Sequence, residues 1–182
     1  PTKAESTQIT VAASSADSLD NVDWAEAIQQ EATITVARMR LRDGSTGWSF
    51  EKIFPAACLK GALHIRLIDP YLFKHHQIRN MNEFLLHVAE TAQPKSVEIV
   101  TSFPPEEGQE SQKRAFDNTA KDLFKNYGVQ ASLIHETGLH DRFLVLDHGV
   151  LFKLGRGLDI FKPAVGLAAH RAANRRVKES EI

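Results

Sequence analysis

The sequence predicts an α/β domain in which helices flank a mixed β-sheet. Strand-like apolar segments alternate with helix-like segments between residues 62 and 134. The region 143–154 then reads as an antiparallel pair that closes around the tight turn Asp147-His148-Gly149. With 42% hydrophobic and 25% charged residues, the chain of 182 residues has the composition of a soluble globular domain large enough to bury a core.

The N-terminal part contains little that predicts packed structure. Residues 1–30 are rich in Ser, Thr and Ala without apolar periodicity, which favours a linker or disordered tail. Within it, Asp23 is suited to cap a short helix over Trp24–Gln30. Thr33–Leu41 alternates and is rich in β-branched residues, so we expect one strand there.

The next predicted helix follows a glycine-rich turn. Ser49 can cap a helix that extends to Leu59, and Pro55 inside it predicts a kink or a restart. Ala62–Ile68 then reads as a buried strand. It must leave the sheet at Asp69-Pro70-Tyr71, because proline cannot donate to a central ladder.

The alternation of helix and strand continues twice more. Apolar residues at helical spacing begin at Ile78, and Pro94 ends that helix. The remaining predicted elements are, in order, strand Val97–Thr101, a Pro- and Glu-rich loop Phe103–Gln112, helix Lys113–Tyr127 and strand Val129–Ile134. Gly128 suits the position just after a helix. We therefore place the domain at residues 31–170 and a basic tail at 171–182.

Charge and cysteine usage exclude several classes of protein. The net charge of −1 gives the whole chain no attraction to nucleic acid or acidic membranes, but residues 150–178 carry seven bases against one acid. This basic end can hold an anion. One cysteine, Cys58, excludes an internal disulfide. The chain has no signal peptide and no apolar run of membrane-spanning length, so we expect a cytoplasmic location. Because it starts at Pro1 rather than Met, we expect it to be a fragment of a longer chain.

A His-x-basic-x4-Asp spacing marks the candidate catalytic residues His140, Arg142 and Asp147. If this stretch is a strand, His140 and Arg142 project to the same side. A histidine can attack phosphorus while a neighbouring cation holds the phosphoryl oxygens. Asp147 lies an odd number of residues from His140, so it can orient the imidazole only from the turn. The pattern predicts either phosphoryl chemistry or phosphate binding.

Gly155-Arg156-Gly157 adds a second candidate element. Glycines let the backbone approach a ligand and point N–H groups at an anion, and the guanidinium of Arg156 can fork onto a phosphate or carboxylate. The alternative is an ordinary loop in which Arg156 pairs with Asp159.

A third group of polar residues follows strand 62–68, at the strand end where ligands of α/β sheets collect. Its members are Asp69, Tyr71, His76, Gln77 and Arg79. If this strand lies beside residues 140–147, the group lines the same site as His140. We expect no metal or cofactor, because a histidine set of His75, His76 and His140 lacks carboxylate support at ligand spacing.

Taken together, these blocks resemble the C-terminal phospholipase-D-like domain of MIT-domain-containing proteins over about residues 46–163. The blocks are Asp69-Pro70-Tyr71 with His76-Gln77, His140-Asp141-Arg142, and Gly155-Arg156-Gly157-Leu158-Asp159 with Phe161-Lys162. The resemblance implies a phospholipase D fold, a homodimer, peripheral binding of acidic phospholipid head groups, and fusion to or association with another domain. It implies ligand binding by Arg142, Arg156, Gly155, Gly157, His76, Asp69 and Tyr71.

The wider phospholipase D superfamily uses a His-x-Lys-x4-Asp motif twice. Here Arg142 replaces the lysine and the motif occurs once. Arginine keeps the phosphate-binding charge but removes a titratable role. We therefore expect a non-catalytic module. The alternative is a phosphodiesterase or nuclease whose active site a homodimer completes, and this version would bind nucleic acid. A third possibility is a protein-interaction domain that uses the acidic N-terminal part.

Overall fold

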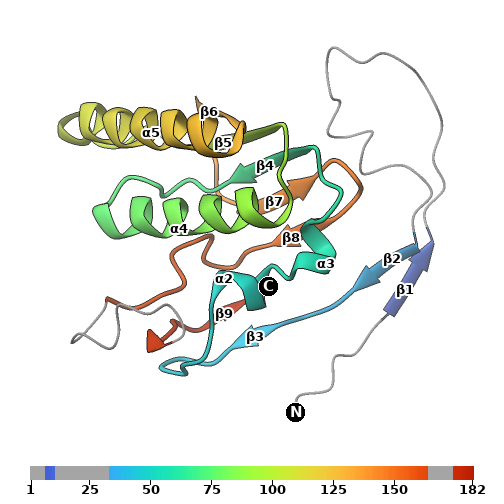
Figure 1. The fold of residues 1–182 in the computed structure, drawn as a ribbon. Coiled ribbons are helices and arrows are strands. Elements are labelled where there is room, and N and C mark those ends of the chain that lie inside the picture. The colour runs from blue at the N-terminus through green and yellow to red at the C-terminus, as the bar shows by residue number, and fades with distance from the viewer. Residues whose placement is uncertain (1–6, 11–32, 164–173) are drawn as a thin grey trace.

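A computed structural model describes residues 7–10, 33–163 and 174–182 (Figure 1). Its centre is a five-stranded mixed sheet in the order β6-β5-β4-β7-β8. The strands are β4 (His64–Ile68), β5 (Ser96–Thr101), β6 (Gln130–His135), β7 (Phe143–Leu146) and β8 (Leu151–Lys153). β4, β5 and β6 run parallel to one another, while β7 is antiparallel to β4 and β8 to β7. The predicted α/β class with a mixed sheet is confirmed.

Two long helices, α4 (His75–Thr91) and α5 (Glu106–Tyr127), lie on one face of this sheet (Figure 1). Alternate strand residues are buried beneath them, because successive side chains of a strand point to opposite faces. The most buried of these are Ile65, Leu67, Val97, Ile99, Leu144 and Leu146. The opposite face carries polar pairs across β4 and β5, His64 with Ser96 and Arg66 with Glu98. The period-2 pattern therefore decides which side of the sheet becomes core.

The short helices α2 (Phe50–Ile53) and α3 (Ala56–Leu59) close the end of the core next to α4. Phe50 and Phe54 contact Phe84 of α4 edge to face, at ring-centroid distances of 5.8 and 5.2 Å. The predicted restart at Pro55 is confirmed, since α2 ends before it and α3 begins after it. Ser49 precedes α2 as expected, but its hydroxyl makes no capping hydrogen bond.

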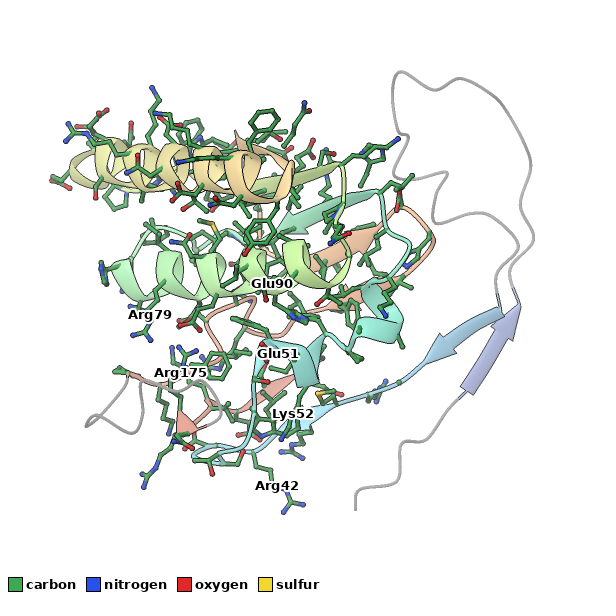
Figure 2. All side chains as sticks on the ribbon, in the orientation of Figure 1. Arg42, Glu51, Lys52, Arg79, Glu90 and Arg175 are labelled. Atoms are coloured by element: carbon green, nitrogen blue, oxygen red, sulfur yellow. The ribbon has the colours of Figure 1, made fainter. Side chains whose placement is uncertain are left out.

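Residues 174–182 belong to the folded domain, so the predicted boundary at residue 171 does not separate a tail there. β9 (Ser180–Glu181) pairs antiparallel with β3 (Arg40–Leu41). Val177 is fully buried, and Arg175 is 4% exposed. Figure 2 shows Arg175 below α4, between that helix and the C-terminal segment. The excess of basic residues therefore gave a wrong prediction for this segment. Which of its side chains are buried depends on contacts with residues far away in the sequence.

Two other predictions need correction. The single strand expected over Thr33–Leu41 is two strands, β2 (Thr33–Val36), which pairs with β1 (Thr7–Thr10), and β3, which pairs with β9. The loop expected over Phe103–Gln112 is helical from Glu106 onward. Pro105 occupies the N-cap position and two glutamates stand in the first turn, where they favour the helix dipole.

The other boundaries agree with the sequence predictions. α4 ends at Thr91, shortly before Pro94, and Gly128 ends α5 in the left-handed conformation with φ +71°. The turn Asp147-His148-Gly149 joins β7 to β8. The predicted helix at Trp24–Gln30 and most of the predicted tail 1–30 lie outside the described residues; within 1–30, only 7–10 are described, as β1.

Candidate anion-binding site

The site is built around a buried carboxylate at the carboxyl end of β4. Asp69 is 1% exposed, and its two oxygens accept the N–H groups of Tyr71 at 3.1 Å and Leu158 at 2.8 Å. Burial raises the pKa of the Asp69 carboxyl, and the two N–H donors and Arg142 oppose that rise. Asp69 therefore ties the strand end to the glycine-flanked loop.

Gly157 is the residue that permits this contact. It adopts φ +59°, and a Cβ there would lie only 2.0 Å from Asp69 Oδ2. Its N–H donates to Leu154 O at 3.3 Å, and the Gly155 N–H donates to Glu181 O at 2.9 Å. The N–H groups of both glycines are therefore used in hydrogen bonds within the protein. The sequence had predicted that they would point at an anion.

Arg142 brings the three sequence blocks together. Its Nε lies 3.9 Å from Asp69 Oδ1, its Nη1 donates to Gly155 O at 2.9 Å, and its guanidinium lies 4.6 Å from the centroid of the Tyr71 ring. We call Asp69, Tyr71, Arg142 and Gly157 the polar cluster. Within it the arginine crosslinks the loops while 24% of its side chain stays exposed.

Arg156 lies at the rim of the polar cluster and points outward. Its Nε donates to Glu179 O at 2.7 Å, which fixes the side chain. Among the described residues its Nη groups make no hydrogen bond, and the residue is exposed. The predicted pairing of Arg156 with Asp159 does not form. Asp159 instead contacts Lys178 Nζ at 2.7 Å and His76 Nε2 at 3.4 Å.

His140 and Asp147 are not brought together. His140 is exposed in the loop before β7, where no strand aligns it with Arg142, and within the described part of the chain it makes no hydrogen bond or ion pair. Asp147 follows β7 at its other end, and its carboxylate accepts the N–H groups of Leu63 and His64 at 3.0 to 3.2 Å. A strand of four residues spans about 13 Å. Within one chain, Asp147 therefore joins the end of β7 to the start of β4 and cannot orient His140.

Across residues 33–163 and 174–182, no three His, Cys, Asp or Glu side chains are grouped so that they could hold a metal ion. Of the helices described, none has both the length and the apolar character needed to cross a bilayer.

Comparison with known proteins places the chain in a family. A family described as the phospholipase D-like domain at the C-terminus of MIT matches residues 47–182, well over half of the sequence. The chain belongs to this family. The resemblance inferred from the three sequence blocks is thereby confirmed, and the match extends through the C-terminal segment that packs against β3.

A relative of this phospholipase D-like domain is MIT domain-containing protein 1 from Mus musculus. It is 25% identical over 130 residues, which cover 71% of this chain and 52% of the relative. The chain thus spans about half the length of that relative.

Sequence reasoning missed the residues of the C-terminal segment that hold this site in place. Glu179 anchors Arg156 through its carbonyl, and Lys178 pairs with Asp159. Asn80 of α4 donates to Leu158 O at 3.0 Å from the other side. The only sequence signal was the excess of bases after residue 150, which does not identify their partners.

The raised pKa of Asp69 predicts a pH dependence of stability. The folded state keeps the proton at pH values where the unfolded chain has lost it, so the contribution of Asp69 is complete below about pH 4 and declines as pH rises through the folded pKa. The free energy of unfolding of the wild type, measured against Asp69→Asn by urea denaturation, should fall between pH 4 and pH 7. A difference that rises with pH would contradict the assignment.

Proposed function

We propose that this phospholipase D-like domain binds a phosphate-bearing anion, the head group of an acidic phospholipid, without turning it over. The observation that carries the proposal is Arg156, whose Nε is fixed by Glu179 while the residue is exposed. A guanidinium held in this way loses little freedom when it forks onto a phosphate. The fold supplies the fixing contact, so the geometry exists before a ligand arrives.

The neighbouring charges support an anion at this place. Arg142 is partly exposed and donates to the carbonyl of Gly155, the residue before Arg156. Lys178 and His76 both contact the carboxylate of Asp159, and Lys178 neutralises it, so Asp159 adds no net negative charge at this place. Engagement of a bilayer would be peripheral, through head groups, and the domain would act as one part of a longer protein.

The same geometry favours binding without turnover. A nucleophilic histidine needs a group that orients its imidazole, and His140 has no such partner within the described chain. Arg142 takes the place of a lysine and is occupied by Asp69 and Gly155. A phosphodiesterase or nuclease remains the second candidate only because His140 is exposed to solvent. Hydrolysis of a generic phosphodiester that disappears in His140→Ala would establish that alternative.

Removing the Arg156 side chain is the direct test of the binding function. We expect Arg156→Ala to weaken binding to vesicles that contain phosphatidylserine by about tenfold, the effect of one charge-assisted contact. Vesicle flotation measures this, with phosphatidylcholine vesicles as the neutral comparison. Arg114→Ala is a matched control, because Arg114 is also an exposed arginine but lies on α5 and pairs with Glu110. Equal recovery of wild type and Arg156→Ala on both vesicle types would refute the lipid proposal.

A further inference from the structure

A hollow of about 740 Å³ opens between β3 and α2. Residues of both elements and of the turn that joins them line it, and neither Arg156 nor any member of the polar cluster is among them. Its volume lies within the range of about 300 to 1,000 Å³ that is usual for small-molecule sites. The side chains that give it its character are those of Arg40, Arg42, Ser45, Trp48 and Lys52. We call it the basic hollow.

Three basic side chains line the basic hollow, and one carboxylate offsets them. Arg40 Nη2 lies 2.6 Å from Glu179 Oε1, so the charges of this pair cancel. Arg42 is exposed, and its guanidinium makes no ion pair or hydrogen bond with another residue that the structure describes. Lys52 Nζ donates to the carbonyl of Gly47, which carries no charge. In Figure 2, Arg42 and Lys52 lie on the lower side of the molecule, away from α5. Two positive charges therefore remain for an anion.

Trp48 contributes an aromatic wall to the same hollow. Its Nε1 donates to Ser45 Oγ at 3.1 Å, and Ser45 Oγ donates to Arg42 O at 2.7 Å. The half-buried indole is therefore held in one orientation by the turn that also carries the free guanidinium. Stacking of a nucleobase on an aromatic side chain contributes about 1 to 3 kcal/mol. The hollow thus offers aromatic surface next to two positive charges.

The chemistry of the lining selects among the possible anions. A phosphate alone would use the cations but not the indole. Inositol and sugar phosphates present hydroxyl groups that need acceptors. Within the described part of the chain, no carboxylate or amide side chain lines the hollow to supply them. A base presents an aromatic face and few donors, which suits this lining.

A nucleic acid strand fits less well than a single nucleotide. A strand needs free cations along its backbone, because each phosphate contact adds to the affinity. The arginines that precede Arg42 at alternate positions are both paired, Arg38 with Glu181 and Arg40 with Glu179. The free positive charge is therefore confined to the basic hollow.

We propose that the basic hollow binds a nucleoside diphosphate, with its base against Trp48 and its phosphates between Arg42 and Lys52. The guanidinium of Arg42 can fork onto two phosphate oxygens, while the ammonium of Lys52 acts as a point charge on the same group. Arg156 belongs to a different site, since its anchor is the carbonyl of Glu179 and not the carboxylate that pairs with Arg40. Soluble nucleotide and lipid vesicles therefore probe the two sites separately.

Isothermal titration calorimetry with ADP tests this inference. We expect a dissociation constant of about 100 μM at low ionic strength, and values at least about tenfold higher for adenosine and for pyrophosphate, since each carries only half of the recognised chemistry. Arg42→Ala should weaken ADP binding by about tenfold. Arg38→Ala is the matched control, because it removes an exposed arginine from the same side of the chain but outside the hollow, and it should change binding by less than about twofold. Circular dichroism checks the folding of both variants.

Tryptophan fluorescence gives an independent readout of the base. The chain has two tryptophans, so in Trp24→Phe all tryptophan emission comes from Trp48. ADP should quench this emission with the dissociation constant found by calorimetry, because the base stacks on the indole. Pyrophosphate should leave the emission unchanged.

Several results would overturn the inference. One is the absence of ADP binding up to about 2 mM, and another is an Arg42→Ala variant that binds as well as the wild type. Pyrophosphate binding as tight as that of ADP would reduce the hollow to a phosphate site. Tighter binding of inositol phosphate would assign it to lipid head groups, and tighter binding of oligoadenylate would make it a strand site. ADP binding without quenching would show that the base does not contact Trp48.

Discussion

Replacing Gly157 with alanine should destabilise the domain by about 3 to 5 kcal/mol, a large part of the stability of a typical domain. Two costs combine. The residue sits at φ +59°, where an L side chain is strained, and the new Cβ would lie 2.0 Å from a carboxylate oxygen of Asp69. The carboxyl cannot retreat cheaply, because it is buried and holds the N–H groups of Tyr71 and Leu158. Urea denaturation monitored by circular dichroism measures the loss.

Gly138→Ala separates the two costs of that substitution. Gly138 has a similar positive φ of +77°, but no atom lies within 4 Å of the position that its Cβ would take. The free energy of unfolding of this variant should fall only by the cost of placing an L residue at positive φ, about 1 kcal/mol. If both variants lost the same free energy, the contact with Asp69 would be irrelevant to the cost. If Gly157→Ala were as stable as the wild type, the close packing of the loop on Asp69 would be wrong.

Local patterns were sufficient for the central elements of the fold. Apolar strand-like segments between helix-like segments indicated β4, β5 and β6. Pro55 predicted the break between α2 and α3, and Gly128 predicted the end of α5. Both predictions depend only on the backbone conformation of the residue itself. The start of α5 was missed because proline and glutamate, read as loop residues, are also favourable at a helix N-terminus.

The candidate site was only partly predictable, since its contacts join residues far apart in the chain. Sequence spacing put Asp147 and His140 in one candidate motif, yet β7 separates them and Asp147 accepts the N–H groups of Leu63 and His64. Arg142 was found by its motif, but its partners Asp69 and Gly155 follow from tertiary structure. The motif identifies residues, and the register of the sheet decides which of them can act together.

The C-terminal segment shows how a charged residue can be structural where composition predicts a solvated tail. Arg175 donates to Asn80 Oδ1 at 3.3 Å, forms an ion pair with Glu83, and stacks over Phe161 at 4.2 Å from the ring centroid. Its Nε is buried and has no hydrogen-bond partner among the residues that the structure describes. The segment is therefore attached to α4 by a guanidinium and to Gly44 and Ser45 by the backbone of Val177, and the anchor of Arg156 at Glu179 follows only a few residues later.

Arg175→Ala should therefore reduce the free energy of unfolding by about 2 to 4 kcal/mol, through a cavity, a lost ion pair and a lost contact with Phe161. Arg176→Ala is the matched control, because the adjacent arginine is exposed, and it should change stability by no more than about 0.5 kcal/mol. Urea denaturation measures both.

Hydrogen exchange distinguishes anchoring of the segment from general destabilisation. The N–H groups of Met39 and Ile182 donate to one another's carbonyls, at 2.7 and 2.9 Å, where the segment meets the chain before β3. In Arg175→Ala these amides should exchange faster by a larger factor than those of β4 and β5, because the segment would open without global unfolding. Acceleration by the same factor in all these strands would show that Arg175 stabilises the domain as a whole. Since Glu179 positions Arg156, selective opening should also weaken vesicle binding, and Arg175 would then act on the anion site as a positioning residue.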